Sequence, residues 1–107
     1  GLLPEQGGAR PSTPSGVKSE VRGGQVMLTW EAVPGARFYR VERAGVAGSA
    51  KEMVAMGLTT AQFSEPAPPR GEAAEYTVFA VGRNGASAGS EAVGVEVPRG
   101  RQVGLQH

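Results

Sequence analysis

The chain has no cysteine and no aspartate, and its only histidine, His107, is the last of its 107 residues. Without cysteine no disulfide can form, so packing alone must hold the fold together. A hydrolase nucleophile would lack its usual base, and a zinc site would lack its usual nitrogen and sulfur ligands. Calcium sites need clustered Asp or Asn oxygens, and Asn84 is the only asparagine. We therefore predict no catalytic residue, no metal and no cofactor, and give His107, whether native or a tag remnant, no role.

Long apolar runs and basic blocks are missing too. No stretch approaches the ~18–20 apolar residues that a membrane span needs, so no membrane insertion is expected. The net charge is +1 and no basic block exists, which argues against a nucleic-acid partner. Every acid is glutamate, arginine outnumbers lysine, and alanine and glycine abound, a bias typical of GC-rich bacterial genes. The chain starts at Gly1 without an apolar signal core, so we interpret it as a piece of a longer protein whose targeting signal lies elsewhere.

Seventeen glycines and eight prolines divide the sequence into short segments. Residues 1–13 are rich in proline and glycine and are predicted to be a linker. Residues 99–107 form a polar tail without a repeating pattern. Residues 14–98 are enough for one β-sandwich domain that folds unaided.

Alternation of apolar and polar residues predicts β-structure throughout this domain. Strands are expected at residues 17–21, 25–31, 37–43, 59–63, 75–82 and 93–97. Residues 51–56 could form a strand or a helical turn, and Gly57 is expected to end that segment. Arg83-Asn84-Gly85 is expected to be a hairpin turn. About seven strands at this spacing predict an all-β fold, an antiparallel two-sheet β-sandwich with an immunoglobulin-like architecture.

The alternation also predicts which side chains face the core. Trp30 and Tyr39 are the most informative of them, since they put the only indole and a tyrosine on the inward faces of successive strands. The complete predicted inward set is Val17, Val26, Leu28, Trp30, Tyr39, Val41, Phe63, Tyr76, Val78, Ala80, Val93 and Val95. Trp30 is therefore interpreted as a core residue and not as a platform for stacking a sugar.

In this order and spacing the residues resemble a fibronectin type III domain over residues 12–98. The tryptophan lies on the second strand, whereas immunoglobulin domains carry it on the third, between two cysteines. The motifs that carry the resemblance are Val26-x-Leu28-x-Trp30, Val33-Pro34-Gly35-Ala36, Tyr39-x-Val41-x-Arg43, Phe63 with Glu65, Tyr76-x-Val78-x-Ala80, and Gly85-x-Ser87-x-x-Ser90. One position departs from the family. The corner tyrosine should fall near Ala74, so either Tyr76 takes its place in a shifted register or the corner is absent.

The resemblance implies a non-catalytic module of a larger, bacterial-type multidomain protein. The first hypothesis is an accessory or spacer domain of a secreted or cell-surface protein, with a carbohydrate-active enzyme as one setting. The second is a protein–protein recognition module of the adhesion type, and the third is weak carbohydrate binding. Neighbouring domains of the same polypeptide are the expected partners, followed by another protein or a polysaccharide. The domain is expected to be a monomer.

Two phenylalanines, Phe38 and Phe79, fall out of phase with the inward residues of their strands. In the family topology these strands are adjacent, so both rings would share the outer face of one sheet with Arg40. One interpretation is a cross-strand aromatic pair that stabilises the sheet, and the other is a docking patch. The candidate partner-contact residues are Phe38, Arg40 and Phe79 on this face and Arg83 and Asn84 in the predicted turn.

Overall fold

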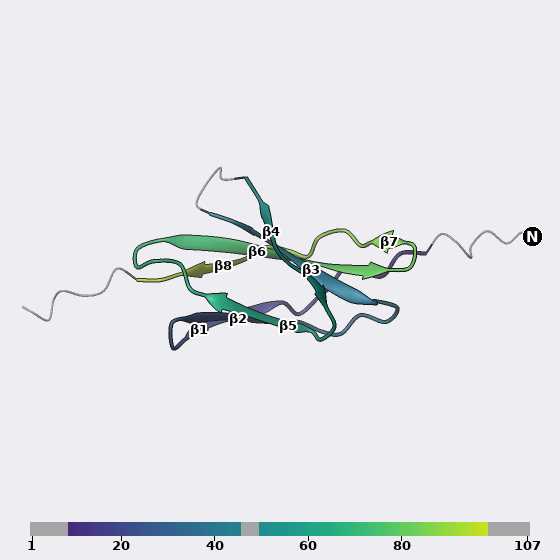
Figure 1. Ribbon diagram of the computed structural model, residues 1–107, viewed down its shortest axis with the longest axis horizontal. Helices are drawn as coiled ribbons and strands as arrows, with labels where there is room; N and C mark the ends of the chain where they lie inside the picture. The colour runs from purple at the N-terminus through teal and green to yellow at the C-terminus, as the bar shows by residue number, and fades with distance from the viewer. Residues whose placement is uncertain (1–8, 46–49, 99–107) are drawn as a thin grey trace, which may run out of the picture.

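A computed structural model describes residues 9–45 and 50–98, which form eight β-strands without a helix (Figure 1). The strands are β1 (Lys18–Arg22), β2 (Gln25–Thr29), β3 (Phe38–Ala44), β4 (Glu52–Leu58), β5 (Gln62–Pro66), β6 (Ala73–Gly82), β7 (Gly85–Ala86) and β8 (Val93–Glu96). Most of the predicted linker, the polar tail and His107 lie outside the described residues.

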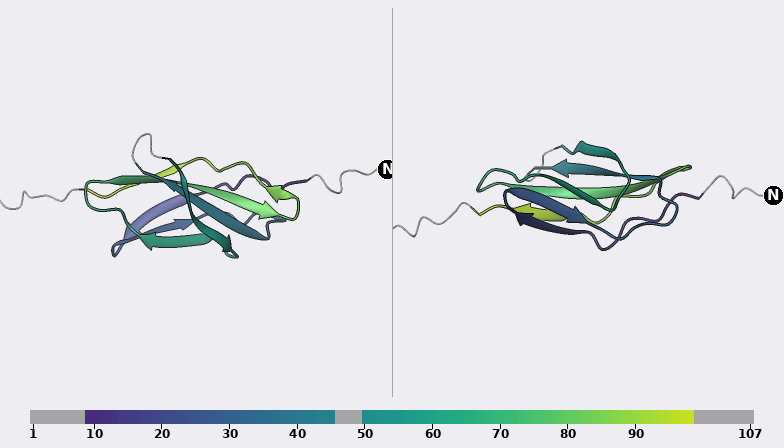
Figure 2. Two further views of the ribbon diagram at one scale, coloured as in Figure 1. Left: turned by 45° about the horizontal axis from the view of Figure 1, so that its top comes forward. Right: turned by 60° about the horizontal axis from the view of Figure 1, so that its bottom comes forward.

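All strand pairs are antiparallel and they form two sheets, which lie as two layers in Figures 1 and 2. The smaller sheet has the order β1-β2-β5. The larger has the order β4-β3-β6-β7, with β8 also pairing with β6. The predicted all-β sandwich is thus confirmed. The structure has eight strands instead of about seven because the predicted hairpin turn leads into the two-residue strand β7.

The core lies between the two sheets and is built mainly by the inward-facing side chains of β2, β3 and β6. Val26 and Leu28 on β2 are fully buried while Met27 between them is exposed, the period of two that a strand produces. Trp30 is 7% exposed. The buried hydrophobic residues are Val26, Leu28, Trp30, Val33, Tyr39, Val41, Ala74, Tyr76, Val78, Ala80 and Val95. Val17, Phe63 and Val93, which we also predicted to face inward, pack against this core and are partly buried.

Trp30 and Tyr39 form the aromatic centre of one end of the core. Their ring centroids are 5.3 Å apart and their planes meet at 72°, the edge-to-face arrangement that aromatic pairs favour. The Tyr39 hydroxyl accepts a hydrogen bond of 2.8 Å from the backbone N–H of Val33. This bond fixes the loop between β2 and β3, so Tyr39 orders the loop as well as the core.

Two strand boundaries differ from the sequence prediction. The segment left open as a strand or a helical turn is strand β4, Glu52–Leu58. The strand runs through Gly57, so the prediction that Gly57 ends the segment was wrong. Gly57 has φ 80° and is skipped in the register, since Tyr39 pairs with Leu58 and Arg40 with Met56. It forms a bulge that only a residue tolerant of positive φ adopts easily. The strand predicted at residues 59–63 instead covers Gln62–Pro66, because pairing with β2 fixes its register.

Two serines complete the edge of β6 between β7 and β8. Ser90 donates its backbone N–H to the Val78 carbonyl, and its Oγ accepts from the Val78 N–H at 2.9 Å. Ser87 makes the same pair of bonds with Ala80. Both serines are buried, so their hydroxyls replace the partners that a longer β7 would have supplied. The serine spacing in the sequence therefore has a structural purpose.

Ala74, near which the resemblance places the corner tyrosine, is 4% exposed and has no hydroxyl. Tyr76 has a different role. Its hydroxyl donates a hydrogen bond of 2.6 Å to Glu65 Oε2, and Arg43 Nη1 donates to both oxygens of the same carboxylate, at 2.9 and 2.7 Å. Glu65 comes from β5 in one sheet and the other two residues from β3 and β6 in the other. We call these three residues the inter-sheet clamp.

The inter-sheet clamp changes how its members ionise. Burial raises the pKa of the Tyr76 hydroxyl well above its ordinary value, and the hydrogen bond to Glu65 raises it further. The same carboxylate raises the pKa of the Arg43 guanidinium through their hydrogen bonds. Tyr76 therefore stays neutral, and Arg43 charged, in the folded protein well into alkaline solution.

The raised pKa of Tyr76 predicts an alkaline loss of stability. The unfolded chain releases this proton near pH 10, while the folded protein keeps it. The contribution of Tyr76 to the free energy of unfolding is therefore fully present below about pH 10. Above that pH it falls by up to about 1.4 kcal/mol per pH unit. Denaturant unfolding between pH 8 and 11.5 measures this decline. The Tyr76→Phe variant should decline less steeply above about pH 10. The same dependence of the unfolding free energy on pH in the two proteins would contradict the prediction.

Candidate interaction surfaces

The outer face of the larger sheet carries Phe38, Arg40 and Phe79. The three residues are neighbours there, as the sequence predicts. Arg40 pairs directly with Phe79, and Phe38 pairs with Val81. With Met53 and Met56 of β4, these three residues form what we call the aromatic face. It lies on the side of the sheet opposite the core, because Tyr39 and Val41 between them point inward.

Phe79 interacts with a cation and not with the other phenylalanine. The Arg40 guanidinium carbon lies 4.1 Å from the centroid of the Phe79 ring, a cation–π contact. Among the described residues, the aromatic ring pairs are Trp30–Tyr39 and Phe63–Tyr76. The predicted aromatic pair of Phe38 and Phe79 is therefore not formed. The reason is the register, which puts the two rings on a diagonal and Arg40 opposite Phe79.

The edges of the aromatic face differ in how they are covered. On the β6 side the backbone at Gly89 closes over Phe79, since a Cβ there would lie 3.0 Å from the ring and 2.7 Å from Thr77. On the β4 side, Met53 and Met56 are 54% and 53% exposed. They stand opposite Glu42 and Arg40 in the register. Sequence reasoning missed both methionines because the secondary structure of residues 51–56 was left open.

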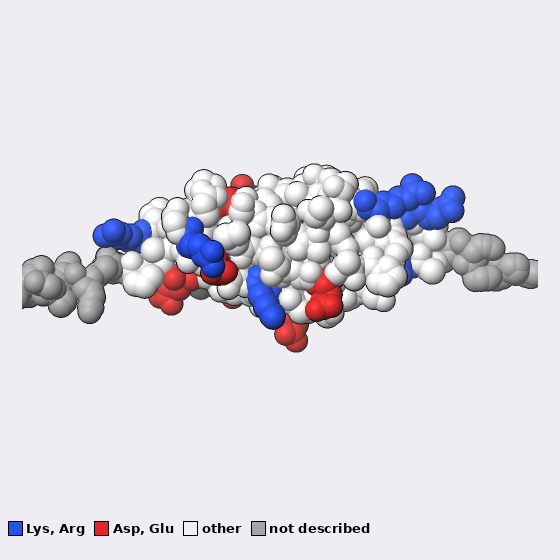
Figure 3. Space-filling view, turned by 90° about the horizontal axis from the view of Figure 1, so that it is seen from below, with Lys and Arg blue, Asp and Glu red and all other residues white. Residues whose placement is uncertain are grey.

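Arg83 and Asn84 do not lie on the aromatic face. They form the turn between β6 and β7, at the end of the sandwich where the described chain begins. The Asn84 side-chain amide donates a hydrogen bond of 2.9 Å to the Ala9 carbonyl. Arg83 lines a groove there together with Arg10 and Arg37, two arginines that the sequence did not single out. Figure 3 shows basic side chains gathered at this end.

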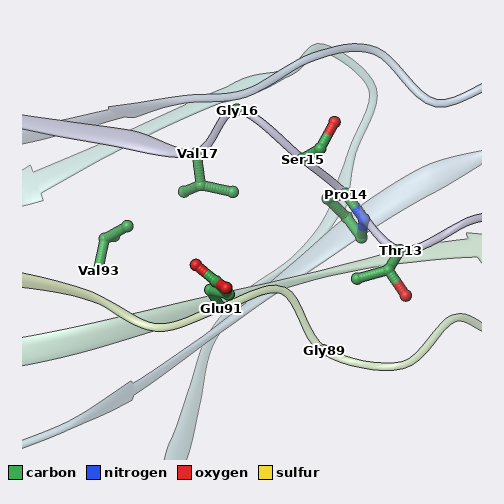
Figure 4. A pocket seen from close by; sticks show the side chains of 8 residues that line it. All are labelled: Thr13, Pro14, Ser15, Gly16, Val17, Gly89, Glu91 and Val93. Carbon is green, nitrogen blue, oxygen red and sulfur yellow. The ribbon is translucent and has the colours of Figure 1, made fainter.

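A further groove runs along the seam between the two sheets, between the segment before β1 and the segment before β8 (Figure 4). Val17 and Val93 face each other across it, and the Glu91 carboxylate stands between the two segments. Thr13, Pro14, Ser15, Gly16 and Gly89 complete this lining. Glu91 is the only titratable side chain in this lining, and without a second acid or a base the groove has no pair of groups for general acid–base chemistry.

Residues 9–45 and 50–98 bring no three His, Cys, Asp or Glu side chains together in a way that could hold a metal ion. Within these ranges no helix is long and apolar enough to cross a membrane.

Solved structures of fibronectin type III domains are similar to this chain. A Fn3-like protein from Clostridium thermocellum is 25% identical, with a TM-score of 0.69, and the match covers 89% of this chain and 98% of that one. The FN5 domain of Drosophila Lar is 21% identical, with a TM-score of 0.64 and coverage of 84% and 99%. The twitchin kinase region from C. elegans is 19% identical, with a TM-score of 0.72, and the match covers 90% of this chain but 19% of that one.

These matches show a fibronectin type III fold, as the sequence motifs predict. No protein-family model and no curated protein matches the sequence. The twitchin match, and one at 22% identity to titin kinase with its flanking domains, show the same fold as one module within a longer chain.

Proposed function

We propose that this fibronectin type III domain is a non-catalytic spacer module of a secreted or cell-surface bacterial multidomain protein, with a carbohydrate-active enzyme as one adjoining domain. The observation that carries the proposal is the path of the chain. The described chain begins at one end of an elongated sandwich and leaves it at the opposite end (Figure 1). β6 alone, with ten residues, spans about 33 Å at ~3.3 Å per residue. A folded domain of this shape holds its neighbours apart at a fixed distance.

Two further observations support a spacer. The inter-sheet clamp and the aromatic core connect the two sheets without a disulfide, and these contacts make the elongated domain stiff. The only tryptophan is 7% exposed, so it offers no platform for a sugar ring. No observation on the described surface favours the carbohydrate-binding hypothesis over the spacer.

The spacer proposal is tested by the width of an end-to-end distance distribution. The chain is placed between two fluorescent proteins, and single-molecule energy transfer is recorded with and without urea. A folded spacer should give a narrow distribution that broadens in urea to that of a flexible chain. The Trp30→Ala variant has the same length. Under conditions where it is unfolded, its distance distribution should be broad even without urea. Equal widths for the folded and unfolded chains would refute the proposal.

Protein recognition through the aromatic face is the second candidate. It is favoured by the half-exposed Met53 and Met56 beside the cation–π pair of Arg40 and Phe79. Methionine side chains are flexible and adapt to irregular partner surfaces, and arginine and aromatic residues are enriched where interfaces concentrate their energy. The expected partner is a neighbouring domain of the same polypeptide.

A double substitution tests the second candidate. Phe38→Ser with Phe79→Ser should leave the domain folded, since neither residue belongs to the buried core, but should weaken its contact with the parent protein about tenfold or more. Calorimetric titration of the isolated domain against the remainder of the protein measures the contact. Met27→Ser, on the outer face of the other sheet, is the matched control and should change nothing. Unchanged affinity in the double variant would eliminate this candidate.

A further inference from the structure

Three arginines from distant parts of the sequence line one groove at the end of the sandwich where the described chain begins. We call it the arginine groove. Its lining includes Arg10, Arg37 and Arg83 beside Ala9, Pro11 and Pro34. All three arginines are exposed. The basic side chains at this end of Figure 3 stand without an acidic side chain among them, and no acid is present in the lining.

The fold holds the three segments of the groove together by specific contacts. The Arg37 backbone N–H donates to the Val81 carbonyl at 2.8 Å, which fixes the end of the β2–β3 loop beside β6. The Asn84 amide fixes Ala9, the residue before Arg10. Gly82 permits the close approach, because a Cβ there would lie 2.9 Å from the Gly35 carbonyl oxygen. The three guanidinium groups are therefore brought together by ordered backbone.

The charges of these arginines are not balanced within the described structure. The ion pairs within residues 9–45 and 50–98 involve Arg22, Arg40 and Arg43, each with a glutamate. Arg10, Arg37 and Arg83 are in none of them. Like charges held close together repel, and an anion relieves that repulsion. A guanidinium group offers a planar pair of N–H donors that matches a carboxylate.

The remaining lining identifies the kind of anion. The apolar part of the groove is formed by Pro11, Pro34 and Ala9, without an aromatic ring. A sugar ring would find no planar surface on which to stack, whereas the aliphatic stem of a glutamate packs well on proline. We propose that the arginine groove binds an acidic peptide segment, whose carboxylates pair with Arg10, Arg37 and Arg83. The source of the segment, an adjoining domain of the same protein, rests on the proposed spacer function.

The test uses the full chain and a fluorescent hexaglutamate peptide, with anisotropy as the readout. Binding is expected at about 20 mM salt and should weaken strongly at about 200 mM, because screening shortens the reach of exposed charges. Arg37→Glu with Arg83→Glu should weaken it at least about tenfold. The matched control, Arg22→Glu with Arg70→Glu, makes the same change of net charge on residues outside the groove and should weaken it less than about twofold. Thermal melting verifies that each variant is folded.

Three outcomes would overturn the inference. Equal weakening by the two double variants would mean that net charge alone attracts the peptide. Absence of hexaglutamate binding at low salt would mean that the groove has no affinity for carboxylates. Tighter binding of a sulfated oligosaccharide than of hexaglutamate would assign the groove to a glycan. The distance distribution that tests the spacer does not depend on these arginines, so the two proposals can fail separately.

Discussion

Replacing Trp30 with alanine is expected to lower the free energy of unfolding by ~3–5 kcal/mol. The side chain is 7% exposed and packs edge to face against Tyr39, so its removal leaves a cavity and takes away the support of Tyr39. Tyr39 in turn accepts the hydrogen bond that orders the Val33 loop. Small domains have total stabilities of about 5–15 kcal/mol, so this one change should leave a large unfolded fraction. Circular dichroism must follow the melting, because the variant has no tryptophan.

Two companion variants separate packing from other causes. Met27→Ala, on the strand that ends just before Trp30 but 40% exposed, should cost less than about 1 kcal/mol. Trp30→Phe should cost clearly less than Trp30→Ala, because it keeps a ring in the core and because the indole Nε1 is buried without a partner among the described residues, a group whose burial is unfavourable. Cooperative melting of Trp30→Ala near the wild-type temperature would contradict this account of the core.

The sandwich could be predicted from sequence because its signal is local. Val26, Leu28 and Trp30 alternate with exposed residues, and so do Tyr39 and Val41, which indicates both the strands and their inward faces. Register is harder to predict, since it depends on the partner strand. This is why the fifth strand was placed three residues early and why Gly57 was interpreted as a break. Its positive φ is absorbed by a bulge that only the pairing with β3 reveals.

The surfaces were less predictable than the core. Alternation placed Phe38 and Phe79 on one outer face, but it could not reveal that Arg40 would stack on Phe79. Arg83 and Asn84 were candidates from the sequence, but Arg10 and Arg37 were not, because these segments meet only through the close approach at Gly82. Glu65 stands with Phe63 among the motifs of the resemblance, yet its partners lie on the other sheet. Such contacts depend on topology, which no local period encodes.

Glu65→Gln is expected to destabilise the domain by ~1.5–3 kcal/mol, the range for hydrogen bonds that involve charged groups. The carboxylate receives two bonds from Arg43 and one from Tyr76, and its side chain is 15% exposed. The neutral amide keeps the shape but loses the charge that Arg43 needs. Glu52, 3.4 Å from Arg43, is 67% exposed and compensates only weakly. Urea unfolding at pH 7 measures the change.

A matched control comes from an ion pair within the smaller sheet. Glu20→Gln breaks a 2.6 Å contact with Arg22, but these side chains are 54% and 71% exposed, and exposed pairs contribute about 0–1 kcal/mol. A loss for Glu65→Gln no larger than for Glu20→Gln would show that the clamp contributes nothing beyond an exposed pair.

Removing the whole clamp should be less harmful than removing its centre. In the triple variant Arg43→Met, Glu65→Leu and Tyr76→Phe, no buried charge or hydroxyl is left without a partner, and only Glu52, which is 67% exposed, loses its contact. Apolar replacement of buried ion pairs is often neutral or stabilising. We expect this variant to be at least as stable as Glu65→Gln. The clamp would then contribute to the domain chiefly by fixing how the two sheets are aligned, since only this alignment brings Glu65 to both Arg43 and Tyr76. A triple variant much less stable than the single one would instead make the clamp a principal source of stability.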